Sequence, residues 1–153
     1  MLALVWTFGA ALAADEYPTS PDPRLTPGAL CEQPDQIRYP ERIKYCERNV
    51  SVDDKWKIIR SYQALGFEIP SEKRSDYKID HLIPLCAGGS NSPMNLWPQH
   101  KTVYEKTDRL EQLLCDKMSR GQITQSEVMN WILQAKAKPA EAPAMTKKLA
   151  ASP

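Results

Sequence analysis

The chain has 153 residues, with 20 basic and 19 acidic side chains and a formal net charge of +1 at pH 7. Because these charges nearly balance, the chain has no large basic surplus that would steer the whole protein onto nucleic acid. Hydrophobic residues make up 42% of the chain, which excludes a fully disordered protein and suffices for a modest buried core.

The N-terminal segment, Met1 to Ala14, is apolar and uncharged and ends in Ala-Leu-Ala-Ala. Small residues in this pattern suit signal peptidase, so we expect a cleaved export signal over residues 1–14, although no Lys or Arg precedes the apolar run. A membrane anchor fits less well, because about 20 apolar residues are needed to span a bilayer. The mature chain is therefore expected in the periplasm or outside the cell, without stable membrane association, as one domain over residues 15–135.

Prolines cluster between Asp15 and Tyr39, which predicts an irregular arm that wraps around the domain. From Arg38 to Arg48 basic and aromatic residues alternate. This strip either contacts phosphate groups or is an ordinary solvated face, since Glu41 and Glu47 lie within it.

A capping box at Ser51 begins a predicted helix that ends near Gly66, with Trp56 and Ile59 facing the core. The charged segment that follows is expected to be a solvated connection into Tyr77.

The segment from Asp80 to His100 contains both histidines of the chain. A short apolar run from Ile79 to Leu85 stops at the pair Gly88-Gly89, which allows a sharp reversal of the chain. Leu96 and Trp97 then form a second short strand, which Pro98 is expected to end. The pattern predicts a β-hairpin followed by a helix.

Beyond Pro98, apolar residues at helical spacing predict a helix of about five turns that ends at Gly121. These residues are Val103, Thr107, Leu110, Leu114 and Met118. A capping box at Thr124 opens a shorter helix. From Lys136 onward the sequence lacks a periodic apolar face, and a disordered tail is expected over residues 136–153.

The four cysteines include no C-x-x-C pair, which argues against a structural zinc site. In an exported chain they are expected to form two disulfides, for which the sequence allows three pairings. We favour Cys31 with Cys46, which would fasten the N-terminal arm, and Cys86 with Cys115, which would tie the hairpin to the long helix, because each bond then joins expected neighbours.

The residues Asp80-His81, Pro84-Leu85, Gly88-Gly89 and Asn95-Leu96 together resemble the HNH endonuclease motif. Asn95 lies fourteen positions after His81, as in that family, and Asn95-Leu96-Trp97-Pro98-Gln99 is similar to its secreted bacterial branch. The resemblance covers at least residues 79–116. It implies a ββα-metal core within an α+β fold, one divalent cation, and hydrolysis of phosphodiester bonds in DNA, with RNA as the alternative substrate.

The same residues suit this chemistry on physical grounds. A histidine with an unperturbed pKa near 6.5 can deprotonate water near neutral pH, which makes His81 the candidate general base. Asp80 supplies an oxygen ligand for Mg²⁺ or Mn²⁺, and Asn95 can fix the loop that orients the imidazole. Neighbouring residues on a regular strand face opposite ways, so Asp80 and His81 share a site only if the strand twists, bulges or ends there.

The second metal ligand is open. In many family members it lies about nine residues after the asparagine, where this chain has Tyr104, a poor ligand for magnesium. His100 is the nearest suitable donor, ahead of Glu105, and an imidazole ligand would also admit Zn²⁺ or Ni²⁺. Lys101, Lys106 and Arg109 either bind the phosphate backbone or form an exposed helix face.

Two functions remain from the sequence. The first is an exported, metal-dependent endonuclease that cleaves DNA through Asp80, His81 and Asn95. The second is a non-catalytic module that binds nucleic acid or protein and keeps the HNH scaffold for its shape, as the tyrosine at 104 and the nearly neutral charge allow.

Overall fold

The structure is a computed structural model that describes residues 17–152, so the expected export signal lies outside the described residues. The strands are β1 (Gln36–Arg38), β2 (Ile43–Tyr45), β3 (Tyr77–His81) and β4 (Leu96–His100). The α-helices are α1 (Val52–Gln63), α2 (Lys101–Ser119), α3 (Gln125–Ala137) and α4 (Ala142–Ala150). Short 3-10 helices lie at Ser71–Asp76, Leu85–Ala87, Pro93–Asn95 and Pro139–Glu141. The expected α+β class is confirmed.

The hairpin of β3 and β4 lies at the centre of the described chain. The strands are antiparallel and pair His81 with Leu96 and Asp80 with Trp97. The expectation that Pro98 ends the second strand was wrong, because β4 continues to His100 and Pro98 pairs with Ile79. The sheet has only two strands, so the outer edge of β4 has no neighbouring strand. A proline on β4 can turn its nitrogen, which carries no hydrogen, toward that edge without losing a hydrogen bond.

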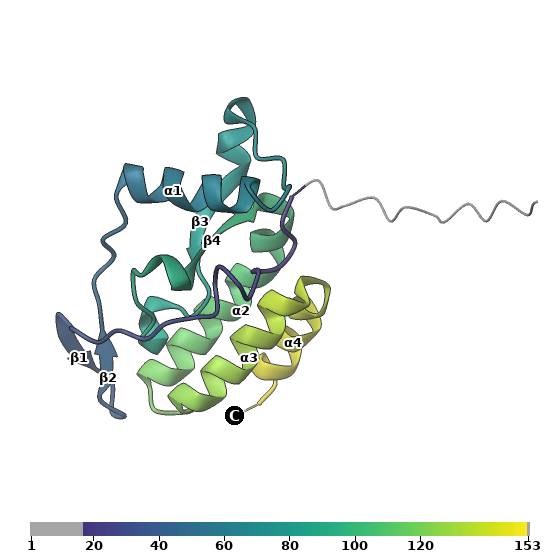
Figure 1. Ribbon diagram of the computed structural model, residues 1–153. Helices are drawn as coiled ribbons and strands as arrows, with labels where there is room; N and C mark the ends of the chain where they lie inside the picture. Colours follow the sequence, from purple (N-terminus) through teal and green to yellow (C-terminus); the bar gives the residue numbers. More distant parts are fainter. Residues whose placement is uncertain (1–16, 153) are drawn as a thin grey trace, which may run out of the picture.

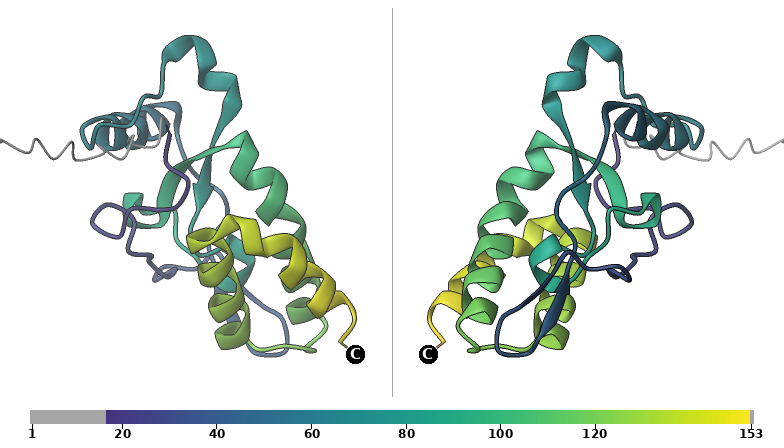
Figure 2. Two further views of the ribbon diagram at one scale, coloured as in Figure 1. Left: turned by 90° about the vertical axis from the view of Figure 1, so that its right-hand side faces the viewer. Right: turned by 90° about the vertical axis from the view of Figure 1, so that its left-hand side faces the viewer.

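Helices cover both sides of this hairpin (Figures 1 and 2). On one side α1 packs against β4, and a buried cluster joins Ile58, Ile59 and Tyr62 of α1 to Ile79 of β3. On the other side α2 follows β4 directly, and α3 and α4 pack against α2. The predicted apolar positions of α2 are buried: Val103, Thr107, Leu110, Leu114 and Met118. The hairpin followed by a helix is thus present as expected.

The two predicted helix starts are formed by local capping. Ser51 Oγ accepts a hydrogen bond from the N–H of Asp54 at 3.1 Å. Thr124 and Glu127 form a reciprocal capping box at the start of α3. Ile59 is fully buried, whereas Trp56 is half-buried against the same cluster.

The disordered tail expected over residues 136–153 is corrected by the structure. α3 continues to Ala137, and α4 packs against α2 through Ala142, Met145 and Leu149, which are buried. These side chains recur at helical spacing, so they form the apolar face that the alanine and lysine content concealed. Pro143 stands in the first turn of α4, where the backbone N–H groups make no hydrogen bond within the helix, so the missing N–H of proline costs nothing there.

The N-terminal arm is irregular along most of its described length and wraps the α1 side of the hairpin. Thr26 Oγ1 lies 2.8 Å from the Tyr62 hydroxyl and donates to the Leu96 carbonyl at 2.9 Å. The arm ends in β1, which pairs with β2 in a second hairpin that the sequence did not predict. Tyr39 and Arg42 adopt positive φ at its turn, which the residue types did not signal.

Both expected disulfides are present, Cys31–Cys46 and Cys86–Cys115, and no free cysteine remains. The first joins the arm to the end of β2, and the second joins the 3-10 helix after β3 to α2. Two such bonds indicate an oxidising environment outside the cytoplasm. Within residues 17–152, none of the helices is both long enough and apolar enough to cross a membrane.

Candidate active site

His81 ends strand β3 and is almost fully buried, with 3% of its surface exposed. Its Nε2 lies 3.1 Å from Asn91 Oδ1, and its Nδ1 lies 3.4 Å from a guanidinium nitrogen of Arg48. The orientation of the Asn91 amide is fixed, because its Nδ2 donates to the Glu47 carbonyl at 2.7 Å. Nε2 therefore donates its proton to Asn91, and Nδ1 is the acceptor that faces the guanidinium of Arg48.

Arg48 belongs to the strip that the sequence left open between phosphate contact and solvated face. Its other terminal nitrogen donates to the Ile79 carbonyl at 2.8 Å, which holds the guanidinium beside the strand. The side chain thus lies against the candidate base, where a positive charge favours an anionic ligand.

The environment of His81 keeps the imidazole neutral. Burial lowers the pKa of His81 to about 4, and the charge of Arg48 adds to this effect. The hydrogen bond to Asn91 and the charge of Asp80 act in the opposite direction but do not compensate. At pH 7 the ring is therefore uncharged and able to accept a proton.

Acid should destabilise the fold through this histidine. An unfolded histidine binds a proton below pH 6.5, whereas folded His81 does so only below about 4. Its contribution is present above pH 6.5 and is lost as pH falls toward 4. Between pH 7 and 4.5, wild type should lose about 2 to 3 kcal/mol more unfolding free energy than His81→Gln. Urea unfolding at both pH values measures this difference, and equal losses in the two proteins would contradict the buried neutral ring.

Asn95 fixes the loop between the two strands, as the sequence predicted for a short polar residue there. It is fully buried; its Oδ1 accepts from the Ile83 N–H at 2.9 Å, and its Nδ2 donates to the carbonyls of Ile83 and Ser90 at 3.0 and 2.9 Å. The loop that leaves His81 is thereby held against the start of β4.

Asp80 faces the other side of the hairpin. It pairs with Trp97, one position away from the pair of His81 and Leu96, so the two side chains point to opposite faces. Asp80 lies 2.8 Å from the ammonium of Lys136 and 3.6 Å from that of Lys78. Burial alone would raise the pKa of Asp80, but these two positive charges outweigh it and lower the pKa.

Lys136 of α3 connects Asp80 to α2. Its ammonium donates to Asp80 Oδ2 and to the carbonyl of His81. Glu111 Oε2 of α2 lies 2.9 Å from the same nitrogen, at ion-pair distance without a well-aligned hydrogen bond. Burial lowers the pKa of Lys136, yet the two carboxylates more than reverse this, so its pKa is raised and the charge persists. Burial raises the pKa of Glu111, and the charge of the nearby Lys136 ammonium offsets this rise only in part.

His100 is not brought together with Asp80. It pairs with Tyr77, three positions along β3 from Asp80, so it faces the side that carries His81. Its ring stacks on Tyr17 with the centroids 3.9 Å apart, and its Nδ1 lies 2.9 Å from Thr102 Oγ1 at the start of α2. Glu105, the other candidate ligand, is exposed on α2.

The divalent cation implied by the HNH resemblance does not fit the described residues as they stand. Across residues 17–152, no group of three or more His, Cys, Asp or Glu side chains could hold a metal ion. The two carboxylates that do converge, Asp80 and Glu111, are already bridged by Lys136. Tyr104, at the position where many family members have a ligand, lies under the ammonium of Lys78, with 5.0 Å between the nitrogen and the ring centre.

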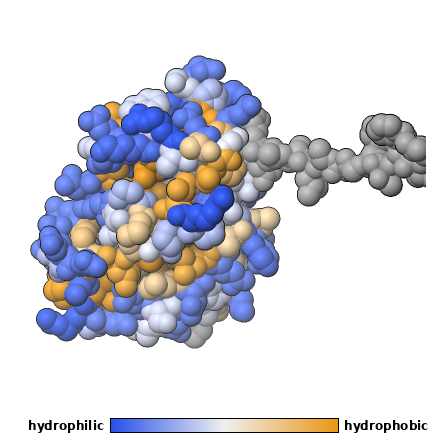
Figure 3. Space-filling model, viewed as in Figure 1, coloured by the Kyte–Doolittle hydropathy of each residue, from blue (hydrophilic) through white to orange (hydrophobic). Residues whose placement is uncertain are grey.

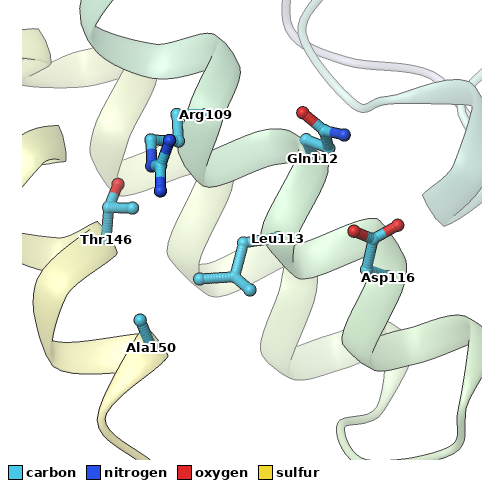
Figure 4. Close-up of a pocket in the computed structure, with 6 residues that line it drawn as sticks. All are labelled: Arg109, Gln112, Leu113, Asp116, Thr146 and Ala150. Carbon is cyan, nitrogen blue, oxygen red and sulfur yellow. The ribbon is translucent and has the colours of Figure 1, made fainter.

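The three predicted phosphate contacts, Lys101, Lys106 and Arg109, are all exposed on α2. Lys101 forms an ion pair with Asp76 at 3.0 Å. Arg109 points toward Thr146 across a depression between α2 and α4, which contains neither Asp80 nor His81 (Figure 4). Figure 3 shows a band of hydrophobic surface across one face, with hydrophilic residues on either side, rather than a continuous hydrophilic surface.

Sequence reasoning missed four residues of the site: Arg48 as a partner of His81, Asn91, Glu111 and Lys136. Glu111 had a usable signal, because it lies seven residues after Tyr104 and therefore on the same face of α2. No pattern in the sequence indicated Lys136, because residues 136–153 were expected to form a disordered tail.

Comparison with family models, curated proteins and solved structures gave no match.

Proposed function

We propose that the chain is an exported nuclease that hydrolyses phosphodiester bonds of DNA, with His81 as general base and Asn95 as the residue that fixes its loop. The observation that carries this proposal is the neutral imidazole of His81, whose Nδ1 faces the guanidinium of Arg48. A neutral base beside a fixed positive charge suits attack on an anionic diester.

The reaction would use the side chains of His81 and Arg48 as follows. His81 Nδ1 takes a proton from a water molecule while the water oxygen forms a bond to phosphorus. The bond from phosphorus to the leaving oxygen then breaks, that oxygen takes a proton from solvent water, and the imidazolium of His81 returns its proton to solvent. Arg48 would stabilise the negative charge on the phosphoryl oxygens, as donors aimed at developing charge do in other phosphoryl transfers.

Export fits the same proposal. The two disulfides form only in an oxidising compartment, and the apolar segment of residues 1–14 would direct the chain there. A nuclease in the periplasm or outside the cell would act on free DNA.

The alternative is a non-catalytic binding module on the same scaffold. It is favoured by the closed state of the site, in which Asp80 is paired with Lys136 and His81 is covered by Arg48 and Asn91. For catalysis, the substrate must displace these two covering side chains from the ring.

A plasmid assay separates the two functions. The oxidised chain, residues 15–153, is incubated with supercoiled plasmid, single-stranded DNA or RNA, in EDTA or with added Mg²⁺, Mn²⁺ or Zn²⁺. The nuclease proposal expects nicking by wild type and none by an identically purified His81→Ala preparation. Equal nicking by both would show that His81 is not the base, and retarded migration of uncut DNA under every condition would favour the binding module.

A further inference from the structure

Lys136 is a buried charge at the meeting point of three elements. Its side chain is only 1% exposed, and it extends from α3 to Asp80 on β3 and Glu111 on α2. Lysine side chains are almost never fully buried unless they are paired. The fold therefore places the positive charge of Lys136 at this position and surrounds it with negative groups.

The groups around the ammonium are all oxygens. Two come from carboxylates, at 2.8 Å from Asp80 and 2.9 Å from Glu111, and the third is the main-chain carbonyl of His81. Carboxylate and carbonyl oxygens are the ligands that hard divalent cations take. A compact ammonium can occupy such a position in place of a metal ion.

We propose that Lys136 is the resident cation of this site. Its ammonium occupies the position between Asp80 and Glu111 that a divalent ion would take, and wild type consequently holds no divalent ion at Asp80. Removing the ammonium converts the site into one that binds such an ion. This inference departs from the metal dependence that the HNH resemblance implies, and it holds whether or not the chain cleaves DNA.

The reason is competition for the same carboxylates. A divalent ion can reach Asp80 and Glu111 together only after the ammonium has left both of them. The displaced ammonium would either stay buried without a partner or move to the surface, which would disturb the packing of α3. Either state is unfavourable. Without the ammonium of Lys136, Asp80 and the half-buried Glu111 lose the cation between them, and Lys78, 3.6 Å from Asp80, is the positive charge that remains nearby. A divalent cation would then relieve the repulsion between the two carboxylates.

Manganese binding tests the proposal directly. Wild type, Lys136→Met and the control Lys138→Met are titrated with Mn²⁺ alone, with calorimetry and the electron paramagnetic resonance of free Mn²⁺ as readouts. Lys138 is a suitable control because it lies on the surface, where its side chain is 67% exposed and paired only with Glu141. Methionine matches the unbranched lysine side chain as far as Cε and removes the ammonium group.

The expected result is binding by Lys136→Met at least ten-fold tighter than by wild type or Lys138→Met. That binding should be lost when Asp80→Asn or Glu111→Gln is added to Lys136→Met. Folded Lys136→Met that binds no more tightly than wild type would overturn the proposal.

A second measurement covers the case in which Lys136→Met does not fold. Wild type and the single variant Glu111→Gln are titrated with Mn²⁺ under the same conditions. The proposal expects that neither binds at this site, so their isotherms should coincide. Binding by wild type that Glu111→Gln loses would overturn it. Because both tests report metal binding, their outcome is separate from that of the plasmid assay.

Discussion

Under the proposed nuclease function, replacing His81 with alanine should slow DNA cleavage by about 10²- to 10⁴-fold, the usual effect of removing a general base. The variant lacks the imidazole nitrogen that faces Arg48, which is the proposed acceptor for the proton of the attacking water. Initial rates of plasmid nicking measure the loss. Partial recovery with added imidazole, which can enter the space left by the ring, would distinguish a lost base from a damaged fold.

The matched control is His100→Ala, which removes the other histidine of the chain. His100 faces the same side of the hairpin as His81 but is four residues further along the ladder, stacked on Tyr17. Its loss should weaken the start of α2 and leave the cleavage rate within a few-fold of wild type. A loss in His100→Ala as large as that in His81→Ala would transfer the chemical role to His100.

Gly89→Ala should cost about 4 kcal/mol or more of unfolding free energy, at the upper end for a single substitution. A methyl group at position 89 would lie 1.8 Å from the Ile83 carbonyl oxygen and 2.8 Å from Asn95 Nδ2. Both are fixed parts of the loop beside His81, because the same carbonyl accepts from Asn95. The loop must therefore open to admit the methyl group, which breaks the hydrogen bonds of Asn95.

Gly66→Ala provides the control for this glycine effect. Gly66 has φ of +98°, but nothing lies within 4 Å of an added Cβ, so only the backbone conformation is strained. Its expected cost is about 1 to 2 kcal/mol. Thermal and urea unfolding of both variants measures the difference, and similar losses at the two positions would show that the clash at Gly89 is relieved without opening the loop.

The parts of the fold that the sequence predicted depend on local spacing. The N-cap at Ser51, the capping box at Thr124, the apolar positions of α2 and the reversal at Gly88-Gly89 are each encoded within a few residues. The disulfide pairing was also within reach, because each bond joins neighbouring segments. α4 was missed because alanine and lysine suit both helices and disordered tails, and only packing against α2 decides between them.

The residues of the candidate site likewise include some that lie close together in the sequence and some that lie far apart. His81 and Asn95 lie in one motif, so their spacing could be read directly. Lys136 is 56 residues from Asp80, and Arg48 is 33 residues from His81. Contacts at these separations depend on how α3 and the segment before α1 pack against the hairpin, which no periodic pattern encodes. The opposite facing of Asp80 and His81 was foreseeable, because it follows from the alternation of side chains along a strand.

For the proposed nuclease, the Cys86–Cys115 bond bears on how a cell could make the chain without damage to its own chromosome. The cytosol keeps thiols reduced, and Cys86 stands on the 3-10 helix inside the loop that Asn95 holds at Ile83 and Ser90. A newly made chain would therefore lack the link between this loop and α2 for as long as it shares a compartment with the genome. Oxidation after export would complete the loop and couple the maturation of His81 to departure from the cell interior.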